Sequence, residues 1–132
     1  MGFYEDRIFP TLLDWVMDNH VMDRQRARTV CRADGVVLEV GAGSGLNRPF
    51  IDTRRVNQWI ALEPSAKLRS RLRARTSDSP VDVEILEGIA ENLPLASASV
   101  DSVVMTYTLC SVHNPALALA EIHRVLKPGG RV

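Results

Sequence analysis

The chain has little of several features that would assign its class directly. It contains two cysteines, Cys31 and Cys110, and no secretory signal, so both are expected to be free thiols. Basic and acidic residues are equal at 16 each, which argues against a broad nucleic-acid-binding surface. No apolar run approaches the roughly 20 residues of a membrane helix, and the N-terminus lacks the basic-then-apolar order of a signal peptide. We therefore expect a cytoplasmic protein without an integral membrane segment.

Groups for metal binding and nucleophilic catalysis are equally scarce. No cluster of His, Cys, Asp and Glu has the spacing of metal ligands, so no metal is expected. No Ser/His/Asp or Cys/His arrangement is evident, and a hydrolase would lack its catalytic residues. With 132 residues, of which 45% are apolar, the chain is long enough for one domain with a hydrophobic core.

A glycine-rich turn follows a short apolar strand in residues 36–45 (VVLEVGAGSG). Glycines let the backbone pass close beneath a ligand, because a Cβ at such positions would collide with it. The spacing is G-x-G-x-G, and Leu46 stands where the dinucleotide fingerprint G-x-G-x-x-G has its third glycine. A tight turn without a ligand is the alternative, but three glycines in five residues cost more entropy than a plain connection needs.

A carboxylate ends the next strand-like run, residues 59–63 (WIALE). The distance from Gly45 to Glu63 fits one helix and one strand of a βαβ unit. A carboxylate at the tip of the second strand can accept hydrogen bonds from both hydroxyls of a ribose. The alternative is a solvated glutamate before Pro64. Together, the glycine turn and Glu63 predict a nucleotide-like ligand.

Helical spacing and capping residues predict the helices. Residues 8–22 have the pattern of an amphipathic helix, and an arginine-rich helix follows before a turn at residues 34–35. A helix begins at residues 46–51, where Pro49 restricts it to an opening turn. Further helices are predicted at 65–77, capped by Ser65, and after Asn114, with Pro115 in first position and an end at residues 127–130.

Strands alternate with these helices. The predicted strands are the apolar run before the glycine turn, residues 57–63, an edge strand at 81–86, a doubly buried strand at 100–109, and one beginning at 131–132. Strands that alternate with helices favour an α/β fold, a doubly wound, Rossmann-like and mostly parallel sheet.

The same residues resemble the class I S-adenosylmethionine (SAM) dependent methyltransferases. The resemblance continues through residues 88–95 (GIAENLPL), 98–105 (ASVDSVVM) and 121–132 (EIHRVLKPGGRV). It is similar to the branch that contains the quinone-biosynthesis enzymes and the "methyltransferase type 11" domain. Residues 3–7 (FYEDR) and 107–112 (YTLCSV) look more like a subgroup linked to small thiols or lipids.

The resemblance implies a binding site for SAM and its product S-adenosylhomocysteine (SAH). Glu39 and the backbone of the glycine turn would line the methionine end, and Glu63 would hold the ribose. Asn47 would bond the methionine carboxylate or ammonium, or would instead cap a helix. Ile89 stands where the family often has an acidic contact to adenine, so apolar and backbone contacts would hold the base. The implied binding residues are Glu39, Gly41, Ala42, Gly43, Gly45, Asn47, Glu63, Pro64, Ile89, Ala90, Thr106 and Leu109.

The acceptor side is less defined, and a small-molecule or lipid-like acceptor is the expectation. His113 follows the fourth strand and is the candidate general base, because an unperturbed imidazole titrates near neutral pH. A plain surface position is the alternative for this histidine. Residues 1–33 form an N-terminal helical segment that serves either as a lid, with Tyr4 as its contact, or as ordinary core packing.

The family fold has seven strands in the order 3-2-1-4-5-7-6, and this chain supplies the first four to five. Residues 34–132 are therefore expected to form a SAM-binding core that is incomplete at its C-terminus. Three interpretations compete: an active methyltransferase, a SAM-binding fragment without turnover, and a nicotinamide-dependent oxidoreductase, which the glycine spacing disfavours. We expect the fourth strand to lie at an open edge, because its usual neighbour is represented only by residues 131–132. Such an edge favours a homodimer or larger assembly through this strand.

Overall fold

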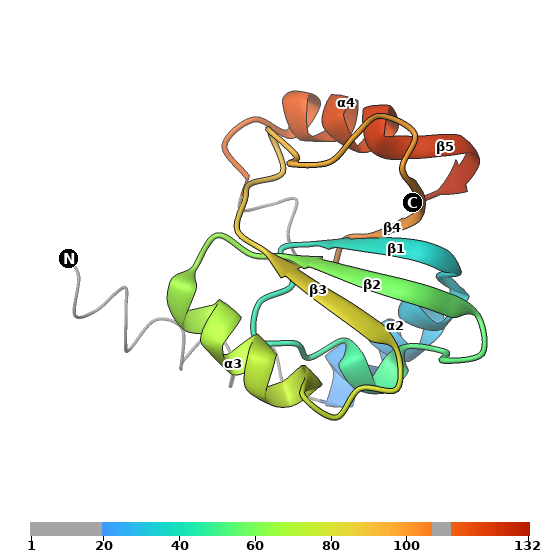
Figure 1. Ribbon diagram of the computed structural model, residues 1–132, viewed down its shortest axis with the longest axis vertical. Helices are drawn as coiled ribbons and strands as arrows, with labels where there is room; N and C mark the ends of the chain where they lie inside the picture. The colour runs from blue at the N-terminus through green and yellow to red at the C-terminus, as the bar shows by residue number, and fades with distance from the viewer. Residues whose placement is uncertain (1–19, 107–111) are drawn as a thin grey trace.

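The computed structural model describes residues 20–106 and 112–132 of the chain (Figure 1). One sheet of parallel strands runs through it in the order β3-β2-β1-β4-β5. The strands are β1 (Gly35–Val40), β2 (Val56–Leu62), β3 (Asp82–Leu86), β4 (Val100–Val104) and β5 (Leu126–Arg131). The chain builds outward from β1 in one direction and then returns to add β4 and β5 on its other side. This confirms the predicted doubly wound α/β fold.

Helices cover both faces of the sheet. Helix α2 (His20–Thr29), the 3₁₀ turn η2 (Val30–Arg32) and α3 (Ala66–Thr76) lie on one face, and α4 (Pro115–Val125) lies on the other (Figure 1). The core is correspondingly divided, because alternate strand residues point to opposite faces. Val37 and Trp59 pack on the α2 and α3 side, whereas Leu38 and Ile60 pack toward α4.

The predicted helix caps are present. Ser65 Oγ accepts a hydrogen bond from the Leu68 amide at 3.3 Å, and Asn114 Oδ1 accepts one from the Leu117 amide at 3.1 Å. Pro115 occupies the first helical position of α4, where its missing N–H costs nothing. Both caps satisfy amides that would otherwise lack partners at a helix start. The starts of α3 and α4 are therefore confirmed.

Three predicted elements differ from the structure. The helix expected after the glycine turn is only the 3₁₀ turn η3 (Arg48–Phe50), which contains Pro49. Strand β4 ends at Val104 rather than at residue 109, and residues 107–111 lie outside the described part. Residues 127–130 do not end α4, because the helix stops at Val125 and they belong to β5. The Lys-Pro-Gly-Gly sequence interrupts the regular pairing of β5 with β4, but these residues still belong to the strand.

Strand β5 lies along the edge of β4 that was expected to be open. Val100 pairs with Leu126 and Ser102 pairs with Arg131, so residues 127–130 of β5 face Asp101 alone. The prediction that β4 is an unpaired edge strand is therefore wrong, since β5 occupies this position. The argument for a homodimer through β4 depended on that open edge and therefore no longer applies. Within the described residues, no helix is long and apolar enough to cross a membrane.

The start of β4 is attached to the start of β1 by side chains. Asp101 Oδ2 accepts a hydrogen bond from the Val36 amide at 2.8 Å, and Lys127 Nζ lies 3.3 Å from Asp101 Oδ1. The Ser102 hydroxyl accepts from the Asp34 amide at 3.1 Å and donates to the Asp34 carbonyl at 3.0 Å. These bonds fix the relative position of two strands whose opposite ends carry the candidate site.

Arg124 on α4 fastens the segment that precedes β4. Its guanidinium donates to the carbonyls of Leu93 at 3.1 Å and Leu95 at 2.9 Å, and it pairs with Glu121 at 2.6 Å. We expect Arg124→Lys to lower the melting temperature by a few degrees, because an ammonium cannot reproduce the planar fork. Thermal unfolding followed by circular dichroism measures the effect, with His123→Ala on the exposed side of α4 as the control. Equal melting temperatures for Arg124→Lys and the wild type would contradict this role.

Candidate functional site

The carboxyl ends of β1, β2, β3 and β4 meet at one edge of the sheet (Figure 1). The residues that follow these strands are the glycine turn after β1, Glu63 after β2, Ile89 and Ala90 beyond β3, and Thr106 beyond β4. Open α/β sheets bind ligands in this position, where the strand order reverses. The structure thus places most of the predicted binding residues at the same edge, from segments far apart in the sequence.

The glycines of the turn have different structural roles. Gly43 has φ +60°, and beyond its chain neighbours no atom of the described residues would lie within 4 Å of a Cβ built there. Gly45 has φ +93°, and its Cβ would lie 2.9 Å from Leu72 Cδ1 of α3. Gly45 therefore permits the turn to pack against α3, whereas Gly43 borders open space. Ala42, directly before Gly43, is buried, and its amide donates to the Leu62 carbonyl at 2.9 Å.

Glu63 is held against the glycine turn. Its side chain is only 6% exposed, so the alternative of a solvated glutamate is wrong. Glu63 Oε2 accepts from the Gly43 amide at 2.9 Å, and Oε1 accepts from the Ser65 amide at 3.1 Å. A carboxylate has about four acceptor positions, so capacity for further hydrogen bonds remains on both oxygens. The neighbouring Pro64 is exposed.

Glu39 is the buried carboxyl at the end of β1. Its Oε2 accepts from Trp59 Nε1 at 2.9 Å, and its Oε1 accepts from Asn47 Nδ2. Burial raises the pKa of Glu39 to about 7, while the bonds from Asn47 and Trp59 and the charge of Arg26 act in the opposite direction. The negative charge of Glu63 adds to the increase in this pKa. Glu39 is therefore partly protonated near neutral pH.

Asn47 links the turn to β4. Its side chain is 3% exposed, and Nδ2 donates to both Glu39 Oε1 and Thr106 Oγ1, the latter at 2.9 Å. Asn47 precedes η3 but makes no side-chain cap, so the helix-capping alternative is wrong. The other amide atom, Oδ1, is buried and has no hydrogen-bond partner in the part of the chain that the structure describes. A buried acceptor without a donor is unusual in proteins.

The predicted adenine contacts separate into two environments. Ile89 is 49% exposed and forms an antiparallel bridge with Asn92. Ala90 and Leu93 are buried in the core beneath α4, and the Leu93 amide donates to Glu121 Oε1 at 3.0 Å. Of these residues, Ile89 is the one with an apolar side chain accessible at this edge.

The residues predicted on the acceptor side are either not joined to the site residues or lie outside the described part of the chain. His113 is exposed before α4, and within residues 20–106 and 112–132 no hydrogen bond or ion pair joins it to Glu39, Asn47 or Glu63. Leu109, Cys110 and Tyr4 lie outside the described residues. Among those described, no group of His, Cys, Asp and Glu is arranged to hold a metal ion.

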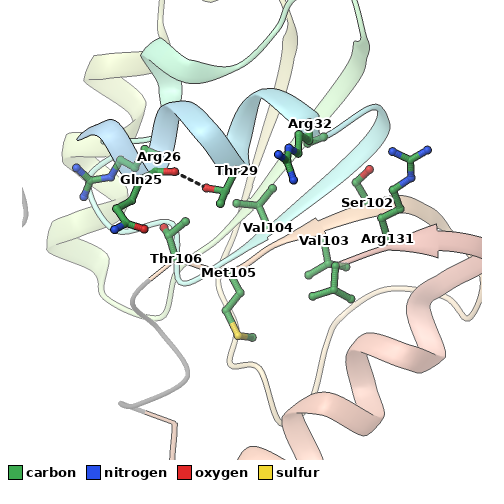
Figure 2. Close-up of a pocket in the computed structure, with 12 residues that line it drawn as sticks. Gln25, Arg26, Thr29, Arg32, Ser102, Val103, Val104, Met105, Thr106 and Arg131 are labelled. Atoms are coloured by element: carbon green, nitrogen blue, oxygen red, sulfur yellow. Dashed lines mark hydrogen bonds between the residues drawn. The ribbon is translucent and has the colours of Figure 1, made fainter. Parts of the chain in front are cut away.

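A cavity of about 630 Å³ lies between α2 and the β4–β5 pair (Figure 2). Figure 2 shows Gln25, Arg26 and Thr106 at one end and Arg32, Ser102 and Arg131 at the other. The cavity contains none of the glycine turn, but it reaches Thr106, which receives the Asn47 hydrogen bond. It therefore adjoins, from the β4 side, the hydrogen-bonded cluster around Glu39, whose other members are Asn47, Trp59 and Thr106.

Sequence reasoning did not identify Arg26 and Trp59 as part of this cluster. Arg26 belongs to a helix that is polar in sequence, yet its side chain is 2% exposed and pairs with Asp23 at 3.1 Å. Trp59 lies on the same face of the sheet as Glu39, opposite Val37 in the register. Glu39 is a carboxylate within an otherwise apolar strand, and a buried carboxylate requires hydrogen-bond donors. This requirement was the signal in the sequence that could have predicted such partners.

Comparisons with known proteins agree with the resemblance. The family model described as "Methyltransferase domain" matches residues 38–132. The chain is 36% identical over 112 residues to a demethylmenaquinone methyltransferase of Thermobifida fusca, covering 81% of this chain and 47% of the relative. It is 34% identical over 97 residues to a thiol S-methyltransferase of Rattus norvegicus, covering 71% and 39%.

A solved structure is similar over nearly the whole chain. It is a SAM-dependent methyltransferase, possibly a histamine N-methyltransferase, from Thermotoga maritima, with a TM-score of 0.69 and 30% identity. The match covers 98% of this chain and 58% of that one. The chain thus spans less than half the length of the two curated relatives.

Proposed function

We propose that this chain, which belongs to the methyltransferase domain family, binds SAM at the carboxyl ends of β1, β2 and β4 and transfers its methyl group to a small-molecule acceptor. The observation that carries the proposal is Glu63, a buried carboxylate whose oxygens are oriented by the Gly43 and Ser65 amides beside the glycine turn. Such a carboxylate suits a pair of ribose hydroxyls.

Four features of the chain fit SAM. The space at Gly43 suits a ligand, since a Cβ there would meet no atom within 4 Å from the described part of the chain beyond its neighbours. Glu63 retains acceptor capacity for the ribose, and Ile89 offers an exposed apolar side chain for the base. Asn47 Oδ1 is a buried acceptor for which the described residues supply no donor. A nicotinamide cofactor is less well supported, because Leu46 replaces the third glycine of its fingerprint.

When bound, SAM supplies a methyl group activated by a sulfonium, and the chain's own residues supply binding and orientation. In-line displacement at a methyl group requires no nucleophilic side chain, since positioning and exclusion of water provide most of the rate. Glu63 and the glycine turn would hold the ribose and the methionine end. His113 is proposed as the base that removes a proton from the acceptor.

The acceptor class is proposed from the relatives. One is named for demethylmenaquinone and another for thiols, so quinone-like and thiol compounds are the acceptors to test. Radiolabel transfer from SAM to such compounds tests turnover, and calorimetric titration with SAM, SAH and NAD tests binding. Binding of SAM with transfer at background would favour the second candidate, a SAM-binding domain without turnover. Binding of NAD alone would reject both.

Glu63→Ala is expected to weaken SAH binding by about 2 kcal/mol, or about thirtyfold, because charge-assisted hydrogen bonds are lost. The Gly43 and Ser65 amides also lose an acceptor, so circular dichroism must show that the fold is retained. Glu84→Ala, an exposed carboxylate on β3, is the matched control and should bind normally. Unchanged affinity in Glu63→Ala would remove the ribose role.

A further inference from the structure

Arg69 lies in the first turn of α3 and folds back over the turn that joins β2 to this helix. Its Nη1 donates to two consecutive carbonyls, those of Glu63 at 2.9 Å and Pro64 at 2.6 Å. Its Nη2 lies 3.3 Å from Oε2 of Glu87, the residue that follows β3. One guanidinium therefore connects the ends of β2 and β3 to the start of α3.

This position is unfavourable for a cation by itself. The N-terminus of a helix carries a partial positive charge, and the first turn of α3 contains no acidic residue. The contacts of Arg69 offset this cost. The side chain of Arg69 is 12% exposed, whereas that of Glu87 is 74% exposed, so solvent screens the ion pair. The charge-assisted bonds to the two carbonyls are therefore the stronger constraint.

The turn between β2 and α3 determines how the Glu63 carboxylate is oriented. The Ser65 amide donates to Glu63 Oε1 at 3.1 Å, so the carboxylate follows the backbone of this turn. Pro64 has no N–H to donate, and its only backbone hydrogen-bonding group is its carbonyl. Arg69 binds the carbonyls of both peptide units that enclose Pro64, and it thereby fixes the turn.

We infer that Arg69 is a positioning residue that holds the Glu63 carboxylate in the orientation required to accept hydrogen bonds from both ribose hydroxyls. The inference rests on the proposed binding of SAM, and it gives α3 a part in recognising the adenosine half of the ligand. Arg69 acts through the backbone of Glu63 and Pro64 and need not touch the ligand.

A positioning role predicts a loss of selectivity for the ribose as well as a loss of affinity. Both hydroxyls can be bound only when the two carboxylate oxygens face them together, and a carboxylate that has turned away binds one at most. Adenosine and 2′-deoxyadenosine differ by the 2′-hydroxyl alone, so the ratio of their affinities reports the orientation of Glu63. The native chain should prefer adenosine by about tenfold or more.

The experiment measures this ratio by competition calorimetry against SAH for the native chain and three variants. Arg69→Met keeps an apolar stem and removes every donor, so adenosine should bind about tenfold more weakly and its preference should fall to about threefold or less. Arg69→Lys keeps the charge without the planar fork, so its ratio should be intermediate. Arg73→Met replaces an exposed arginine one turn later on α3 and should keep the native ratio.

Each other outcome contradicts a definite step. If Arg69→Met is folded by circular dichroism and weakens both nucleosides equally, Arg69 has only a structural role and the inference is overturned. If Arg69→Met does not fold, Arg69→Lys decides the question, and a native ratio in that variant would overturn the inference. Equal binding of the two nucleosides to the native chain would also overturn it. If SAH does not bind the native chain, the proposed function itself fails.

Discussion

In the variant Glu39→Gln, the free energy of unfolding relative to the wild type is expected to rise by about 2–3 kcal/mol between about pH 5 and about pH 8. The carboxyl is 3% exposed, and burial raises its pKa from 4.5 to about 7. Between these values the folded protein binds more protons than the unfolded chain. The wild type therefore loses stability as pH rises through this range, whereas glutamine does not titrate.

Urea unfolding followed by tryptophan fluorescence at the two pH values measures the difference. Asp101→Asn is the control, since the hydrogen bond from the Val36 amide holds the pKa of Asp101 below its usual value, with Lys127 adding to this effect. The stabilisation from Asp101 is present above the unfolded pKa and is lost only as pH falls through the folded pKa. The control should thus show the same deficit at both pH values. A Glu39→Gln difference that does not change with pH would show that Glu39 is ionised throughout.

Gly43→Ala is expected to abolish most SAH binding while the protein remains folded. A Cβ at Gly43 would clash with no atom of residues 20–106 and 112–132, so the stability cost is that of alanine at φ +60°, about 1 kcal/mol. The added methyl would occupy the space into which a ligand must come. We expect SAH affinity to fall by about one to two orders of magnitude, measured by calorimetry.

Gly45→Ala in the same turn is the matched control. Its Cβ would lie 2.9 Å from Leu72 Cδ1, so the substitution must shift the buried Leu72 side chain or the turn. Stability should fall by about 1–3 kcal/mol from this overpacking. The two variants should therefore separate, with Gly43→Ala impaired more in binding and Gly45→Ala more in unfolding. Normal SAH affinity in Gly43→Ala would show that no ligand approaches this residue.

Local signals in the sequence predicted those helices whose first residues are typical capping residues. Ser65 and Asn114 were recognised as caps because their side chains can accept from amides three residues later, which depends on the chain nearby. The sheet order was expected from the resemblance to the methyltransferase family, whereas the alternation of strands and helices predicted the doubly wound class of the fold. The sequence Lys-Pro-Gly-Gly was misinterpreted because it carries the signals of a helix end, whereas pairing with β4 makes it part of β5.

The cluster around Glu39 could be predicted only in part. Glu39, Asn47 and Thr106 were proposed as binding residues, but their mutual hydrogen bonds were not. Asn47 and Thr106 are 59 positions apart and meet only because β1 and β4 are neighbours. Arg26 was assigned to a polar helix, and its burial could not be predicted because it arises from the packing of α2 on the sheet. Side-chain partners across the sheet depend on packing that periodicity does not encode.

The bonds that attach β4 to β1 affect how the protein is made. Val36 and Asp101 are 65 positions apart, so β1 leaves the ribosome long before its second neighbour is synthesised. Until β4 emerges, the apolar β1 presents an unpaired edge on the nascent chain. A pause in translation before residue 100 would prolong this exposure. The middle of the sheet, although encoded early, thus completes its hydrogen bonding only after β4 has been synthesised.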